Sequence, residues 1–212
     1  LSDEGTYHIT VGCTDMGTGC DTIIAQFAAD VLETPIDNIS VYGVDTDISP
    51  YDSGSYASST TYLTGMAAVK ACEQLREHII ALAAARMNKD ASALTFDGEN
   101  VIDESDGSKM SLFDIATASM CNNEISMEVT YSHSSPVSPP PFMAACAEVE
   151  VDPETGAIEL LDYTACVDCG TVVNTNLARV QTEGGLLQGI GMTLYEDIWY
   201  DERGKNLSNS FM

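Results

Sequence analysis

The chain has 212 residues, and its 8 Lys and Arg against 33 Asp and Glu give a formal net charge of −25. Such an excess of negative charge repels phosphate backbones and anionic lipid headgroups, so nucleic acid and a membrane surface are excluded as natural partners. The apolar fraction of 44% is that of an ordinary globular protein. No apolar run approaches the ~20 residues of a membrane span. We therefore expect a folded chain, with residues 1–212 forming a single domain fragment that has two α+β lobes.

The cysteines indicate a reducing compartment. Their number is odd and their density is below that of a small disulfide scaffold, so we expect a cytoplasmic protein. The seven are Cys13, Cys20, Cys72, Cys121, Cys146, Cys166 and Cys169. The chain begins with Leu1 instead of Met, and it starts and stops without a polar tail. This leads us to expect a piece of a longer polypeptide.

The first predicted elements are a strand, a glycine-rich turn and a helix. Residues 7–11 alternate and favour a strand, residues 12–19 carry three glycines, and apolar residues then recur at helical spacing until Pro35. Glycines let backbone amides face a ligand, and a helix start adds unpaired N–H groups and a positive dipole end. The turn lacks both the third glycine of a dinucleotide fingerprint and the Gly-Lys of a phosphate-binding loop. It is a candidate anion site, with a purely structural turn as the alternative.

A second candidate anion site lies in the polar loop of residues 45–61. A short strand at residues 39–42 precedes it, and an amphipathic helix at residues 62–86 follows it. Residues 53–61 place many hydroxyls just before that helix. Hydroxyls and helix-start amides together bind phosphate without Lys or Arg. The alternative is a solvated loop that ends in a helix cap.

The rest of the chain predicts short strands and turns at residues 91–111, a short helix at 112–120 and a hairpin that turns at 152–156. A last helix, at residues 177–195, carries Gly184, Gly185, Gly189 and Gly191. Because each glycine costs an exposed helix roughly 1 kcal/mol, we expect these glycines to be buried against another part of the structure. The predicted fold class is α+β, with three main helices packed on a mixed sheet.

Three other patterns in the sequence bear on function. Cys166 and Cys169 have the spacing of a redox dithiol, although without a second cysteine pair or a nearby His buried thiols are the favoured interpretation. Asn174 and Gln181 lie near the start of the last helix, where amide side chains serve as caps or as ligand contacts. A hydrolase triad has little support, since the chain has three His and no Gly-x-Ser-x-Gly sequence.

Three segments, in this order, carry a resemblance to a known family. They are Gly12-Cys13-Thr14-Asp15-Met16-Gly17-Thr18-Gly19, then Asp45-Thr46-Asp47 with residues 50–61, then Val167-Asp168-Cys169-Gly170 with Asn174 and Gln181-Thr182-Glu183-Gly184-Gly185. Together they resemble the C-terminal portion, the second molybdopterin-binding domain, of the molybdenum-binding subunit in the xanthine dehydrogenase and aldehyde oxidase family.

The resemblance implies which residues contact the cofactor. The two early segments and the late Gln would hold a molybdopterin, through Met16, Gly17, Thr18, Ser55, Tyr56, Ala57, Ser58, Ser59, Thr60 and Gln181. No side chain of the chain would ligate molybdenum, since the family holds it through the pterin. The family's catalytic Glu follows the part that this chain matches, so no catalytic residue is assigned. Thr18 stands where the family usually has Gln, and Tyr56 where small residues are common.

The resemblance also implies a reaction and partners. The family hydroxylates aldehydes or N-heterocycles with oxygen from water, and its pterin is often extended to a cytosine dinucleotide in bacteria. Iron–sulfur clusters and FAD would lie on partner subunits, with the remaining molybdenum-subunit segment completing the site in an oligomer. Two alternatives stay open: a noncatalytic assembly module, and a Cys166/Cys169 dithiol protein.

Overall fold

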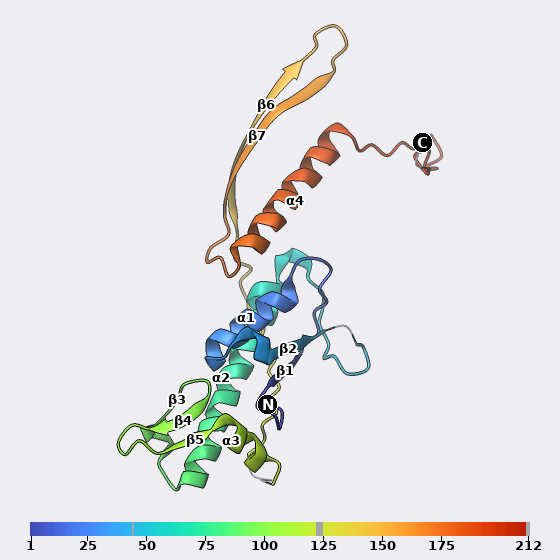
Figure 1. Cartoon of the computed structure of the whole chain (residues 1–212). Coiled ribbons are helices and arrows are strands. Elements are labelled where there is room, and N and C mark those ends of the chain that lie inside the picture. Colours follow the sequence, from blue (N-terminus) through green and yellow to red (C-terminus); the bar gives the residue numbers. More distant parts are fainter. Residues whose placement is uncertain (44, 122–124, 211–212) are drawn as a thin grey trace. The chain divides into compact units, whose positions relative to one another are not determined.

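A computed structural model describes residues 1–43, 45–121 and 125–210, and it divides the chain into two compact units, Leu1–Ser138 and Pro139–Met212 (Figure 1). Helices and strands occur in both units, which confirms the predicted combination of helix and sheet. Among the described residues, none of the helices is both long enough and apolar enough to cross a bilayer. The two units are described separately.

The first unit begins with a parallel strand pair joined by a helix. Strand β1 (Tyr7–Thr10) pairs with β2 (Ile39–Tyr42), with Tyr7 opposite Ile39. Parallel neighbours need a crossover, which helix α1 (Cys20–Leu32) and the short helix η1 (Ile36–Asn38) supply. Helix α1 buries Ile24 and Leu32, which lie eight residues apart and thus on one face of the helix.

Helix α2 (Thr60–Met87) packs along α1, after the short helix η2 (Tyr56–Ser58). The contact is close because Gly65 has no side chain: a Cβ there would lie 2.6 Å from Cε2 of Phe27. Further along, Arg76 donates to Glu33 at 2.6 Å. Both helices start at the same end of the unit (Figure 1). The two predicted anion-binding segments therefore precede helices that start on the same side of the first unit.

The far end of α2 is covered by a small antiparallel sheet and helix α3 (Leu112–Ser119). The sheet has the order β3 (Leu94–Phe96), β4 (Asn100–Asp103) and β5 (Lys109–Ser111), and the short helix η3 (Ala91–Ala93) leads into it. The Ser111 side chain caps α3 by accepting from the Asp114 amide. Ile79, Val101 and Ile115 are fully buried, so this end forms the main core of the unit.

The second unit consists of a long hairpin and a helix. Strand β6 (Phe142–Val151) pairs antiparallel with β7 (Ile158–Asp168), and Asp152 closes the predicted turn by accepting from the Glu154 amide at 2.8 Å. Helix α4 (Thr175–Leu194) is capped by the Asn174 side chain, which accepts from the Leu177 amide. The hairpin and the last helix are both as predicted.

Three features differ in detail from expectation. Parallel and antiparallel pairs both occur, but they lie in three separate sheets. The expectation that the α4 glycines are buried is wrong for Gly184, Gly185 and Gly189, which are exposed. A Cβ on any of the three would meet nothing within 4 Å, and Gly185 and Gly189 line an open cavity with the hairpin instead of packing against it. Cys166, on β7, and Cys169, just after it, are exposed instead of buried, because both strands of the hairpin are largely exposed.

Candidate functional site

The two predicted anion-binding segments are packed together in the first unit. A Cβ on Gly12 would lie 2.5 Å from the Pro50 carbonyl oxygen and 2.6 Å from Cβ of Asp52, so only glycine lets the polar loop approach the turn this closely. Asp52 then ties the loop to α2, because its carboxylate accepts from the Gly54 amide at 2.7 Å and from the Thr64 hydroxyl at 3.3 Å. The polar loop is thus fixed between the glycine turn and the first turns of α2.

In the glycine turn, the backbone amides bind the carboxylate of Asp15 from the turn itself. Asp15 Oδ1 accepts from the amides of Gly17 at 2.8 Å and Gly19 at 3.1 Å. Partial burial acts to raise the pKa of Asp15, but these bonds and the neighbouring amides of Asp21 and Thr18 outweigh it and lower the pKa. The expectation that the turn's amides are free for an external anion is therefore corrected. The Asp15 carboxylate also complements the N-terminus of α1, where Gly19 offers no side-chain cap.

At the start of α2 the nearby carboxylate of Asp52 accepts from the Thr64 hydroxyl, and no described side chain accepts from the N-cap amides. The N-cap residue of this helix, Ser59, is buried. The two preceding residues, Ala57 (φ 56°) and Ser58 (φ 53°), are in the left-handed region that non-glycine residues seldom adopt. Strain of this kind is held by the surrounding structure and clusters at ligand sites. The opening of α2 therefore has the amides, the dipole and the backbone strain of an anion site.

The residues expected to touch a cofactor are mostly open to a ligand. Met16 is 67% exposed and Tyr56 68% exposed. Gly17, Ala57 and Ser58 are also exposed, while Thr18, Ser55 and Thr60 are half-buried and Ser59 is buried. The structure holds all of these in the first unit. Gln181 is exposed on α4 and belongs to the second unit.

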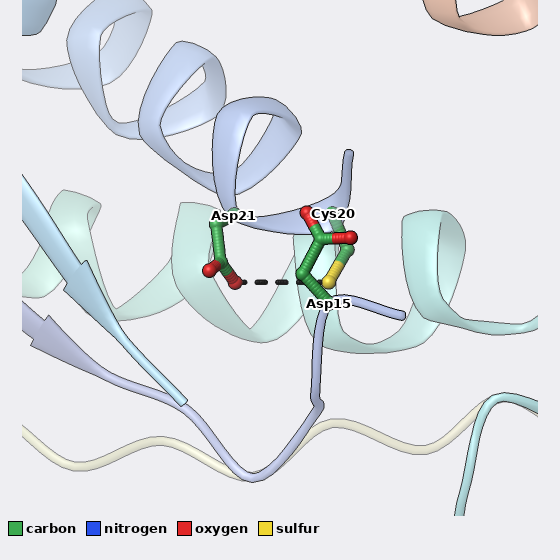
Figure 2. A group of neighbouring side chains, drawn as sticks. All are labelled: Asp15, Cys20 and Asp21. Atoms are coloured by element: carbon green, nitrogen blue, oxygen red, sulfur yellow. Dashed lines mark hydrogen bonds between the residues drawn. The ribbon is translucent and has the colours of Figure 1, made fainter. Parts of the chain in front are cut away.

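Sequence reasoning missed a cluster beneath the turn. The Sγ atoms of Cys13 and Cys20, both buried, lie 4.0 Å apart. The Cys20 thiol also donates to Asp21 Oδ1 at 3.7 Å (Figure 2). Burial first, and then the neighbouring thiol and carboxylates, raise the pKa of Cys13 to about 12. Burial likewise raises the pKa of Cys20. In the sequence, Cys13 and Cys20 stand at the two ends of the glycine turn, and this spacing could have indicated that their thiols lie close together.

A family model described as the molybdopterin cofactor-binding domain matches residues 1–212. The chain belongs to this family. It is 36% identical over 209 residues to the probable hypoxanthine oxidase XdhD of Escherichia coli strain K12, covering 98% of this chain and 22% of that protein. It is 29% identical over 218 residues to subunit gamma of the 6-hydroxypseudooxynicotine dehydrogenase complex of Paenarthrobacter nicotinovorans, covering 100% of this chain and 28% of that one.

Solved structures of molybdenum hydroxylases share the fold of this molybdopterin-binding domain. A reconstituted CO dehydrogenase from Oligotropha carboxidovorans matches with a TM-score of 0.84 and 25% identity, over 100% of this chain and 27% of that one. Quinoline 2-oxidoreductase from Pseudomonas putida 86 matches with a TM-score of 0.81 and 26% identity, over 99% of this chain and 28% of that one. The chain therefore spans about a quarter of the length of the relatives it matches.

Proposed function

We propose that this molybdopterin-binding domain forms one wall of the cofactor site in a molybdenum hydroxylase, and that it holds the phosphate end of the cofactor at the opening of α2. The observation that carries the proposal is the uncapped start of α2 beside the left-handed Ala57 and Ser58. The N-terminus of a 28-residue helix offers unpaired amides and a positive dipole end to an anion.

The charge of the first unit supports this mode of binding. Residues 1–69 contain no Lys or Arg, since Lys70 is the first cationic side chain of that kind in the chain. Within residues 1–69, a phosphate would therefore be stabilised by backbone amides, hydroxyls and the helix dipole instead of by Lys or Arg. Ser55, Ser58 and Thr60 supply hydroxyls at the opening of α2, and Ser59 positions the first turn of that helix.

The remaining proposed contacts surround the pterin. Met16 and Gly17 are exposed and Thr18 is half-buried in the turn that Asp15 holds, so the turn can meet the cofactor as a pre-shaped surface. Tyr56 and Ala57 lie just before the start of α2. Gln181, on α4, is a further proposed contact to the pterin. In this scheme the chain binds, orients and shields the cofactor, and we assign it no catalytic base.

The bound molybdenum pterin supplies the redox chemistry by which an aldehyde or an aromatic N-heterocycle is hydroxylated with oxygen from water. We further propose that the pterin carries a cytosine dinucleotide, that partner subunits carry iron–sulfur clusters and FAD, and that the complete enzyme is a cytoplasmic oligomer. Subunit names among the relatives, such as the gamma subunit of the 6-hydroxypseudooxynicotine dehydrogenase complex, support an assembly of several chains.

The proposal is tested by the cofactor content of the assembled enzyme. We expect Ser58→Asp, which places a carboxylate at the opening of α2, to reduce the molybdenum and pterin that copurify by about tenfold, because like charges repel. Thr95→Asp is the matched control. Thr95 is exposed on β3, and the carbonyl of the next residue, Phe96, accepts from Arg76 of α2. Because Arg76 lies about 24 Å further along α2 than Thr60, Thr95 is far from the opening of that helix. Equal cofactor loss in both variants, or none in Ser58→Asp, would contradict the proposal.

A further inference from the structure

Four acidic or thiol side chains converge beneath the glycine turn, and the proposed cofactor contacts use none of them. Donor atoms of Asp15, Cys20 and Asp21 all lie within 4.8 Å of one another (Figure 2). The Cys13 Sγ lies 4.0 Å from the Cys20 Sγ and adds a second sulfur to the group. Two elements supply the four residues, the turn before α1 and the first turn of α1 itself.

Two of the spacings between these donors are close to the edges of a tetrahedral metal site. With zinc–sulfur bonds of about 2.3 Å and zinc–oxygen bonds of about 2.0 Å, the sulfur–sulfur edge of the tetrahedron is about 3.8 Å and the sulfur–oxygen edge about 3.5 Å. The observed edges are 4.0 Å from Cys13 Sγ to Cys20 Sγ and 3.7 Å from Cys20 Sγ to Asp21 Oδ1. A disulfide is a poorer match, because its sulfur atoms must approach to about 2.05 Å.

The electrostatics of the cluster favour a cation. None of the ion pairs among the described residues includes Asp15 or Asp21, and residues 1–69 provide no Lys or Arg. A divalent cation would offset this negative charge, since it stabilises thiolate and carboxylate together.

We propose that Cys13, Cys20, Asp21 and Asp15 form a site for one thiophilic divalent cation of the zinc and cadmium class. Binding forms two metal–sulfur bonds and releases the two thiol protons to solvent, with no change of oxidation state. Sulfur donors select such ions over calcium and magnesium, which prefer oxygen alone. A carboxylate has about four lone-pair positions, so Asp15 can accept from Gly17 and Gly19 and still coordinate a metal.

The position of the site indicates how the ion would enter and what it would do to the glycine turn. Cys13 and Cys20 are buried, whereas Asp15 and Asp21 are half-buried, so the ion would enter from the carboxylate side. Cys13 and Cys20 bracket the turn that carries Met16, Gly17 and Thr18. A bound ion would therefore join the two ends of the turn and stiffen it, as a structural zinc site does.

The test is a cadmium titration of the 212-residue chain under reducing conditions. A background variant with Cys121, Cys146, Cys166 and Cys169 changed to Ser removes the four exposed thiols, which could bind the ion elsewhere. We expect sulfur-to-cadmium charge-transfer absorption that saturates at about one equivalent. Cys13→Ser and Cys20→Ser in this background should each weaken binding by about tenfold or more. Cys72→Ser, which removes a buried thiol outside the cluster, is the matched control and should leave binding unchanged.

Asp21→Asn keeps the shape of the side chain and provides a second variant if loss of a buried thiol unfolds the chain, which circular dichroism would reveal. It should weaken cadmium binding by about tenfold. Absence of charge-transfer absorption in the background variant would overturn the proposal, as would equal loss of binding in Cys72→Ser or unchanged binding in Asp21→Asn. Since no cofactor takes part in this titration, its failure leaves the proposal for α2 standing.

Discussion

Gly12 and Asp52 lie so close that a Cβ on Gly12 would fall 2.6 Å from Cβ of Asp52. This contact joins two segments that are forty residues apart in the chain, the glycine turn and the polar loop. Asp52 is in turn bonded to Gly54 and Thr64. The geometry of the candidate site therefore depends on Gly12, because only a residue without a side chain lets Asp52 lie this close.

Gly12→Ala should destabilise the first unit. The new methyl group would also lie 2.5 Å from the Pro50 carbonyl oxygen, and a backbone atom cannot yield as a flexible side chain can. We expect a loss of about 1–3 kcal/mol in the free energy of unfolding, measured in urea. Gly184→Ala is the control, because its methyl meets nothing within 4 Å and alanine favours the helix. Equal effects from the two changes would contradict the close approach.

Asp15 should contribute a pH-dependent part of the stability. Its pKa is lowered in the folded chain, because the amide bonds outweigh partial burial. The contribution is therefore complete above the unfolded pKa of about 3.9 and is lost as the pH falls through the lower folded value. We expect Asp15→Asn to reduce stability near neutral pH and to have a smaller effect in strong acid. Urea unfolding of both proteins across this range would measure it, and a difference independent of pH would contradict the assignment.

Lys89→Met should be more damaging than Lys70→Met. The Lys89 Nζ lies 2.8 Å from Oδ2 of Asp103, which is 2% exposed, and it also contacts Asp106. Removing the cation leaves a carboxylate enclosed by protein without its partner. The Lys70–Glu73 pair is instead largely in solvent, where ion pairs contribute little. Thermal unfolding of the two variants compares them, and an equal fall in melting temperature would contradict the burial of Asp103.

The thiols should divide into two classes. A water-soluble disulfide reagent should react quickly with the four exposed cysteines of the native chain and slowly with the three buried ones. Fast labelling is expected at Cys121, Cys146, Cys166 and Cys169. Mass spectrometry of the labelled peptides identifies the sites, and slow reaction of Cys166 and Cys169 would restore the interpretation that they are buried.

The sequence is a good guide to the local elements and a poor guide to what covers them. Periodicity predicts α1, the core of α2 and the hairpin around Asp152, because each follows from spacing and turn chemistry. Burial of the α4 glycines could not be predicted in the same way. It depends on how closely other segments approach the helix, and no described atom lies within 4 Å of a Cβ built on Gly184, Gly185 or Gly189. The Ser- and Pro-rich residues 134–141 were the overlooked signal for the boundary between the units.

The two candidate segments could be picked out from the sequence, whereas the contacts made within them could not. Residues 12–19 and 53–61 were found from their glycines and hydroxyls. That Asp15 occupies the amides of the first segment, and that Cys13 and Cys20 approach to 4.0 Å beneath it, depends on how the turn folds back on itself. Such contacts arise from backbone conformation, which a pattern of residue types does not specify.

Hydrogen exchange of backbone amides tests the central claim most directly. The assembled enzyme with its cofactor would be compared with the same enzyme after removal of the cofactor. We predict that amides of residues 55–61 gain protection in the loaded enzyme, because they would bond to phosphate, while the Gly17 and Gly19 amides change little, because Asp15 already accepts from them. Unchanged exchange at residues 55–61 would contradict the assignment of the α2 opening as the phosphate site.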